Sequence, residues 1–236
     1  MNSTSKQETS FYPLLHQTIL FRNIEPEELP AVLQYLQSYR RSYSSGSTIL
    51  HAGEPVHCIC VVLSGSVTIE KLDLWGNRTI LGAVGPGDLF AEVYAILQTE
   101  PLMVNACANE NSEILFLDIR DLLTQKPHTE YWKQSLLHQL LRIVSMKNLK
   151  LSLRSFHTAE KSLRARIMSY LDSESLRTHS REFDIPFDRQ QMADYLNVDR
   201  TALSKELSRM KKDGLLDFRR NHFQLRDRIP SADAID

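Results

Sequence analysis

The stretch that decides the fold is DRQQMADYLNVDRTALSKELSRMKKDGLLDFRRNHFQL, residues 188–225. Its first part predicts a short helix with its apolar residues on one side. Asn197 then stands where the chain turns sharply, because Asn tolerates the left-handed conformation of a tight turn. Asp199 is a good N-cap for the helix that follows. The apolar residues of the first helix are Met192, Ala193 and Leu196.

The second helix of this stretch is amphipathic. Its apolar side, expected to be buried, is formed by Leu203, Leu207 and Met210, at spacings of four and three. Its opposite side carries Arg200, Thr201, Ser204, Lys205 and Ser208. Two apolar runs follow, at 215–218 and 222–225, and the Arg-Arg-Asn between them indicates a hairpin turn. Two helices joined by a tight turn and followed by a hairpin predict a winged helix-turn-helix.

The polar side of the second helix has the chemistry of a DNA-reading surface. Arg can make bidentate contacts to guanine, while Thr and Ser can bond bases or phosphates and touch thymine methyl groups. A merely solvated face, the alternative, more often alternates Glu and Lys. Glu206 points away from the polar side and is predicted to be structural. The expected base contacts are Arg200, Thr201, Ser204 and Lys205, and the expected backbone contacts are Arg189, Gln190, Lys211, Lys212, Arg219 and Arg220.

Composition and charge distribution are consistent with this interpretation. The 236 residues are 42% hydrophobic and 24% charged, as in a globular protein, and the net charge is −1. Residues 1–130 carry a net −7, whereas 131–184 carry +5 and 185–228 carry +3. An acidic front and a basic back indicate two parts with different partners. Because no apolar run reaches about 18 residues and no signal peptide opens the chain, we expect a cytoplasmic protein without membrane contact.

The segment from Ser44 to Leu117 predicts an antiparallel β domain. Short apolar runs such as CICVVLSGSVTIE and SEILFLD are separated by glycine-containing turns, a spacing typical of a sandwich or barrel. FAEVYAIL, after Gly87, predicts a short helix between strands. A helical pattern precedes the domain within residues 10–40, with Leu29, Val32, Leu33 and Leu36 as its apolar residues.

A long helix follows the β domain, since residues 129–156 contain neither Gly nor Pro. One line of side chains recurs at spacings of 4, 3, 4 and 3, as in a coiled-coil seam, and its Asn is suited to setting the register of two copies. The alternative is a helix packed on its own β domain, which Leu136, Leu140 and Ile143 would serve; both hold if the helix has two such faces. The predicted dimer interface is Leu137, Leu141, Val144, Asn148 and Leu151.

The chain resembles the bacterial CRP/FNR transcription factors over nearly its whole length. The resemblance rests on GSTILHAGEP, VLSGSVTI, GPGDLFAE, the long helix and the helix-turn-helix with its wing. It implies an α+β chain with three parts: a cyclic-nucleotide-binding-like β-roll (jelly roll) over 10–127, a dimerisation helix over 128–157 and a winged helix-turn-helix over 158–228. It also implies a homodimer on palindromic double-stranded DNA, with Arg200, Thr201, Ser204 and Lys205 in the places of base-reading residues.

The resemblance breaks down in the effector pocket. Cyclic-AMP-binding members have Gly-Glu at the start of the short helix and Arg-Ser about ten residues later, where the Arg holds the phosphate. This chain has Ala91-Glu92 and, in ungapped alignment, Leu102-Met103. Losing a charge-assisted contact of about 2–3 kcal/mol lowers affinity roughly 30- to 150-fold, so we expect an effector other than cyclic AMP, of unknown identity. The predicted pocket residues are Glu92, Leu102, Met103, Leu151 and Ser152.

The three cysteines leave a redox or metal role open. Cys58 and Cys60 alternate on one predicted strand, and with Cys107, His51 and His57 they could line a site. The alternative is that they are small core residues. Oxygen-sensing members of the family carry several cysteines near the N-terminus, whereas no cysteine precedes Cys58 here. We therefore assign no metal site, and leave the cofactor unknown.

We expect a DNA-binding transcriptional regulator, with RNA polymerase as a partner if it activates. In this hypothesis, small changes at a hinge near residues 158–162 switch its affinity for DNA. The alternative is a ligand-binding module that regulates another protein. Enzymatic activity is not predicted, because the sequence carries no complete phosphate loop and no recognisable catalytic triad.

Overall fold

The computed structural model describes residues 10–72, 75, 78–124 and 130–226. The chain divides into two compact units, residues 1–146 and 147–236. The expected domain limits at 127, 128 and 228 fall on or beside residues outside the described ranges. Among the described residues, no helix combines the length and apolar character that crossing a membrane requires.

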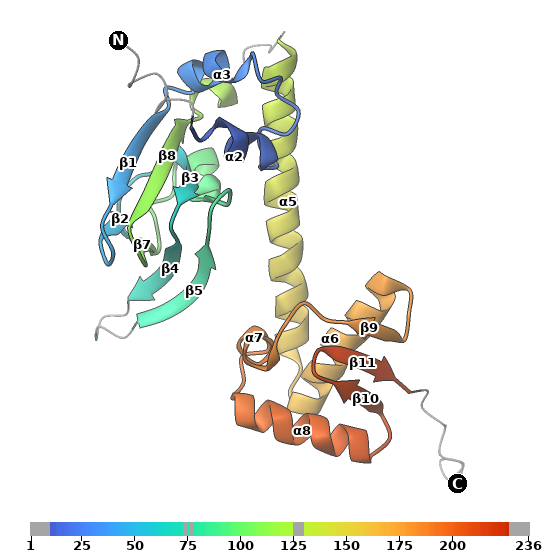
Figure 1. The fold of residues 1–236 in the computed structure, drawn as a ribbon. Coiled ribbons are helices and arrows are strands. Elements are labelled where there is room, and N and C mark those ends of the chain that lie inside the picture. The colour runs from blue at the N-terminus through green and yellow to red at the C-terminus, as the bar shows by residue number, and fades with distance from the viewer. Residues whose placement is uncertain (1–9, 73–74, 76–77, 125–129, 227–236) are drawn as a thin grey trace. The chain divides into compact units, whose positions relative to one another are not determined.

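The N-terminal unit contains two four-stranded sheets, visible beside the upper part of α5 in Figure 1. One sheet has the order β1-β8-β3-β6 and the other β2-β7-β4-β5, and all their pairings are antiparallel. Side chains from both sheets form one buried cluster, which includes Ile49, Val67 and Phe116. This architecture confirms the predicted β-roll. The strands are β1 (Tyr39–Tyr43), β2 (Thr48–Leu50), β3 (Cys58–Ser64), β4 (Val67–Leu72), β5 (Arg78–Val84), β6 (Leu89–Phe90), β7 (Asn105–Ala108) and β8 (Ser112–Asp118).

The prediction that the β domain begins near Ser44 was wrong by one strand. β1 has the sequence YRRSY and pairs with β8 at the edge of its sheet. Its two arginines hide the alternation of apolar residues that reveals a strand. Instead, β1 is held at this edge partly by Tyr39, which stacks on Phe116 of β8 with ring centroids 4.8 Å apart.

Helices cover the other side of the β1-β8-β3-β6 sheet. They are α2 (Tyr12–Gln17), α3 (Leu29–Tyr35), α4 (Glu92–Leu97), the 3-10 helix η1 (Asp121–Leu123) and the first part of α5 (Tyr131–Ala159). The second core of the unit combines apolar residues from α2, α3, β3, β8 and α5. The four residues predicted from the 10–40 segment are all buried in it. Leu136, Leu140 and Ile143 of α5 are also buried there, which confirms that one face of the long helix packs on its own β domain.

Within the described residues, the C-terminal unit contains the last part of α5, three further helices and a three-stranded wing. It contains α6 (Leu163–Thr178), β9 (Glu182–Asp184), α7 (Arg189–Tyr195), α8 (Arg200–Lys212), β10 (Leu216–Arg219) and β11 (His222–Leu225). The wing sheet has the order β10-β11-β9 and is antiparallel throughout. Its core combines the apolar side of each helix with Phe183, Leu216 and Phe223 of the wing.

The polar segment SLRTHSREFD, residues 175–184, contains the end of α6 and the whole of β9. Helix α6 continues to Thr178, and His179 ends it in the left-handed conformation (φ 53°). β9 then adds a third strand to the predicted hairpin, because Phe183 pairs with Phe223 and enters the core. A three-residue strand with one apolar side chain between Glu182 and Asp184 gives too short a pattern to be recognised from sequence.

Candidate DNA-recognition surface

The helix-turn-helix is held by local side-chain chemistry. Asp188 accepts from the backbone N–H of Gln191, and the Gln191 side chain accepts from the Asp188 N–H, which forms a capping box at the start of α7. After α7, Asn197 has a φ of 55°, the left-handed conformation predicted for it. The N–H of Val198 then donates to the carbonyl of Ala193 at 3.0 Å, so the turn closes back on α7.

Asp199 caps the start of α8 as predicted. Its Oδ1 accepts from the backbone N–H groups of Thr201 and Ala202 at 2.8 and 2.9 Å. These bonds, led by that from Ala202, hold the pKa of the Asp199 carboxyl below its usual value. The apolar side of α8 is fully buried, with zero exposure at Leu203, Leu207 and Met210. Burial of that side fixes the rotation of the helix and leaves its polar side outward.

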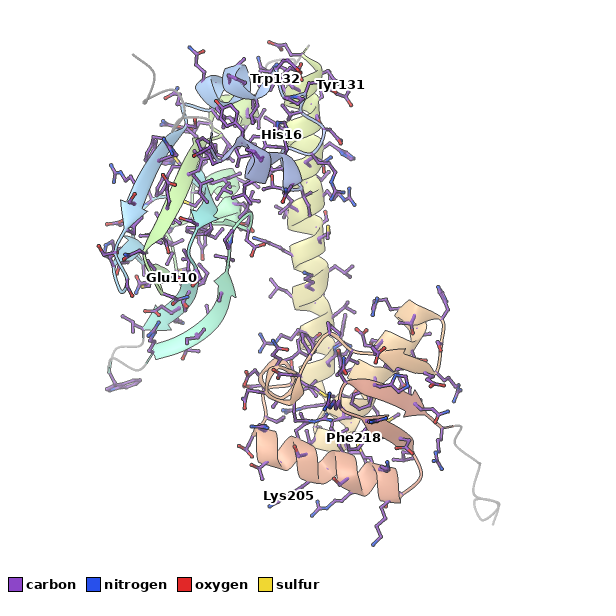
Figure 2. All side chains as sticks on the ribbon, viewed as in Figure 1. His16, Glu110, Tyr131, Trp132, Lys205 and Phe218 are labelled. Carbon is purple, nitrogen blue, oxygen red and sulfur yellow. The ribbon has the colours of Figure 1, made fainter. Side chains whose placement is uncertain are left out.

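The four predicted base contacts lie on the outward side of α8. Arg200, Thr201 and Lys205 are exposed, and Ser204 is half-buried. The Ser204 hydroxyl donates to the Arg200 carbonyl at 2.9 Å, so its lone pairs remain to accept from a ligand. Figure 2 shows Lys205 on α8 at the outer edge of the unit, whereas Phe218 lies within the wing. All four come from the first two turns of the helix, the part of a recognition helix that reaches base edges.

Glu206 takes no part in this surface, which confirms its predicted structural role. Arg164 Nε of α6 lies 2.7 Å from Glu206 Oε1, and Arg164 Nη1 lies 2.7 Å from Asp213 Oδ2. A single guanidinium therefore connects α6 with both the middle and the end of α8. This contact fixes the position of α8 from the side opposite its exposed face.

The wing presents a basic turn. Arg219 pairs with His222 across the hairpin, and Arg220, with a φ of 56°, makes the turn with Asn221. Arg219 and Arg220 are both exposed, as is Lys212 at the end of α8. Phosphate binding by these three exposed residues stays a prediction.

Three other expected backbone contacts also have partners within the protein. Arg189 Nη2 donates to the Arg220 carbonyl at 3.0 Å, and its guanidinium lies over the rings of Phe218 and Phe223. Gln190 Nε2 donates to Asp194 Oδ1 at 2.8 Å. Lys211 Nζ forms an ion pair with Asp217. The sequence did not reveal these structural roles, and phosphate binding by the three stays a prediction.

The expected effector residues fall in both units. Glu92, at the first position of α4, is 4% exposed, and Leu102 is 3% exposed. Met103 is 62% exposed, and its N–H donates to the Tyr94 hydroxyl at 3.4 Å. Leu151 and Ser152 belong to the C-terminal unit, and their part in a pocket stays a prediction. Ala91, before Glu92, adopts the left-handed conformation (φ 63°) that favours the Gly found there in cyclic-AMP-binding members.

The predicted seam of α5 has a graded exposure. Leu137 is partly buried against the core of its own unit, so it serves the β domain, while Val144 is half-buried. Leu141 and Leu151 are 66% and 67% exposed, and Asn148 is also exposed. Side chains this apolar and this exposed are available to a partner helix.

Cys58 and Cys60 have the surroundings of core residues, whereas Cys107 is half-buried beside Thr48 and Glu70. Cys60 is fully buried between the two sheets, and burial raises the pKa of its thiol well above the usual value. Burial is also the main reason that the pKa values of Cys58 and Cys107 are raised. Raised pKa values disfavour the thiolate that metal binding and redox chemistry need. Within the described ranges, no group of three or more His, Cys, Asp or Glu residues is arranged to hold a metal ion.

Comparison with known families matches both units. Residues 40–125 match the cyclic nucleotide-binding domain, and residues 165–229 match the Crp-like helix-turn-helix domain. In both units the chain therefore resembles the CRP/FNR regulators. It is a DNA-binding transcriptional regulator with an N-terminal sensor domain, and the family consists of regulators rather than enzymes.

Two relatives and one solved structure illustrate the relationship. The chain is 32% identical over 140 residues to the cyclic AMP receptor protein of Thermus thermophilus. The aligned region covers 59% of this chain and 63% of that protein. It is 24% identical over 216 residues to the transcriptional activator protein FnrL of Cereibacter sphaeroides, covering 86% and 82%. The structure of a putative cAMP-binding regulatory protein from Silicibacter pomeroyi shares the fold, with 22% identity, a TM-score of 0.50, and coverage of 92% of this chain and 94% of that one.

Proposed function

We propose that this regulator binds a palindromic operator as a homodimer and reads bases with Arg200, Thr201, Ser204 and Lys205. The observation that carries the proposal is the orientation of α8: its apolar side is fully buried, and its first two turns present hydroxyl and cationic groups outward. Lys212, Arg219 and Arg220 flank these turns and supply attraction to the phosphate backbone. We propose that the protein binds its operator DNA in the cytoplasm.

The proposed dimer forms along the exposed part of the α5 seam, at Leu141, Val144, Asn148 and Leu151. Regulators of the CRP/FNR family dimerise, and a parallel pair of helices suits a 4, 3 spacing. A two-fold axis places two copies of α8 in successive major grooves, about 34 Å apart. If the protein activates transcription, RNA polymerase is the further partner.

The proposed effector binds in the β-roll near Glu92 and is less charged than a cyclic nucleotide. A buried carboxylate can accept a hydroxyl, but Leu102-Met103 supplies no cation for a phosphate. A relative is named as a cyclic AMP receptor protein, and that ligand is not carried over to this chain because of this difference. Calorimetric titration with cyclic AMP should show no binding in the micromolar range; micromolar or tighter binding would overturn this part of the proposal.

The deciding experiment is selection of bound sites from random double-stranded DNA with the purified full-length chain. We expect enrichment of an inverted repeat whose half-sites lie about 10 base pairs apart, centre to centre. A variant with Arg200→Ala and Lys205→Ala should not enrich the same site. Enrichment of single half-sites would contradict the dimer, and the absence of any enriched sequence would contradict base reading by α8.

A further inference from the structure

A side-chain hydrogen bond spans the junction between α5 and α6, where the sequence predicts a hinge. Arg166 Nε donates to the Glu160 carbonyl at 2.8 Å, and the Thr158 hydroxyl donates to the Arg154 carbonyl at 2.8 Å. The first bond ties the junction to α6, whereas the second lies within the last turns of α5. The boundary between the two compact units also lies away from this junction. It falls within α5, after Met146, and not at the end of the helix.

Arg154 connects α5 directly to the helix-turn-helix. Its Nε donates to the Tyr195 carbonyl at 3.0 Å, and its Nη2 donates to the Asp194 carbonyl at 2.9 Å. Both carbonyls belong to the end of α7, where a helix carries partial negative charge and favours a cation. The guanidinium also lies 5.8 Å from the centroid of the Tyr195 ring. The two parallel bonds fix the direction of the guanidinium as well as its position.

His157 makes a second connection one turn later. It is 3% exposed, with Nε2 2.8 Å from Ser173 Oγ of α6 and Nδ1 3.0 Å from the Tyr195 hydroxyl oxygen. The Ser173 hydroxyl donates its one proton to the Ser169 carbonyl at 3.0 Å, so it accepts from Nε2–H. Nδ1 of the neutral ring then accepts from the Tyr195 hydroxyl. His157 therefore ties α5 to both α6 and α7.

We propose that Arg154 and His157 form a latch that makes residues 147–159 of α5 and the helix-turn-helix one mechanical unit. This inference rests on the proposed function. It adds the part of the chain, residues 147–159 of α5, that transmits the change in the sensor to the helix-turn-helix. The orientation of α5 in the dimer sets the orientation of α7, and α8 follows α7 after the Asn197 turn. Movement between sensor and DNA-binding parts therefore takes place on the N-terminal side of Arg154. Arg154 is a positioning residue and makes no contact with DNA.

The first test is hydrogen exchange of the full-length chain, without DNA. Arg154→Met removes both donors and keeps an apolar stem, so amides of α7 and of the Asn197 turn should exchange roughly tenfold faster. Lys150→Met is the matched control, since Lys150 is an exposed cation four residues earlier on the same helix, and it should leave these amides unchanged. Arg154→Lys keeps the charge on a single donor nitrogen, and its amides of α7 should exchange at a rate between those of the wild type and Arg154→Met. Tyr195→Phe, which removes the hydroxyl that bonds His157, should speed exchange by about threefold.

The second test is the affinity for the selected operator across a range of salt concentrations. Arg154→Met should weaken binding roughly tenfold and leave the salt slope unchanged, because no phosphate contact is lost. A slope reduced by about one would make Arg154 a DNA contact and overturn the latch. Equal exchange of α7 in Arg154→Met and Lys150→Met would overturn it as well. If the wild type selects no DNA site, the proposed function fails while the exchange experiment still decides the latch.

Discussion

Arg164 of α6 and Glu206 of α8 form an ion pair at 2.7 Å, on the side of α8 opposite the reading surface. Glu206 is 14% exposed at its side chain and Arg164 40%, so solvent screens the pair only in part. Glu206→Gln keeps the shape and removes the charge. We expect a loss of about 0.5–1 kcal/mol in the free energy of unfolding, measured by urea denaturation. Base preference should be unchanged, and a changed preference would place Glu206 in the reading surface.

Asp199 gives the N-terminal end of α8 a pH dependence. Its folded-state pKa is lowered, so its contribution to stability is present above the ordinary carboxyl pKa of about 4 and is lost as the pH falls through the folded value. Asp199→Ala should lower the melting temperature at pH 7, and the difference from the wild type should shrink below about pH 4. Asp172→Ala, at an exposed position of α6, is the control. A difference that persists at pH 3 would show that the carboxylate charge is not what stabilises the cap.

Helix α8 and its surface could be predicted because their signals are local. The spacing of Leu203, Leu207 and Met210 defines a buried side, and Asn197 and Asp199 mark the turn and the cap within one short stretch. The β-roll followed in the same way from glycine-containing turns. Strands β1 and β9 were missed because each depends on pairing with a distant strand: Tyr39 with Phe116, and Phe183 with Phe223.

The double roles of the basic residues could not be predicted, for the same physical reason. Arg154 binds two backbone carbonyls about 40 residues away, and any residue type could supply those carbonyls. Arg189 packs on aromatic rings of the wing, which the position of a cation at the start of a helix does not reveal. Side-chain identity indicated which residues could hold DNA, but only the tertiary contacts show which are already bonded.

Arg200 should determine one base position. Arg200→Ala is expected to cost about 1–3 kcal/mol on the selected operator and to relax the preference at a single position of each half-site. Competition binding with operators changed one base pair at a time measures both effects. Arg209→Ala, which removes an exposed arginine from a later turn of α8, should leave the preference intact. Equal weakening on all sequences would make Arg200 a phosphate contact instead.

Lys212 should contribute to affinity without specificity. It is exposed at the last position of α8, beyond the two turns that carry the predicted base contacts. Lys212→Ala is expected to weaken binding equally on operator and unrelated DNA and to reduce the salt slope by about one. Binding isotherms between about 50 and 200 mM salt give the slope. An unchanged slope would show that Lys212 faces away from the duplex.

Substitution of Leu141 should distinguish the predicted dimer seam from the other faces of α5. Leu141 is 66% exposed in the single chain, and Leu149 is 60% exposed but lies about 80° further round the helix. Leu141→Glu places a charge in the seam, so sedimentation equilibrium should show a monomer and the palindromic operator should be bound as weakly as an isolated half-site. Leu149→Glu adds the same charge outside the seam and should leave the dimer intact. If Leu149→Glu dissociates the dimer and Leu141→Glu does not, the two chains meet along the other face of α5.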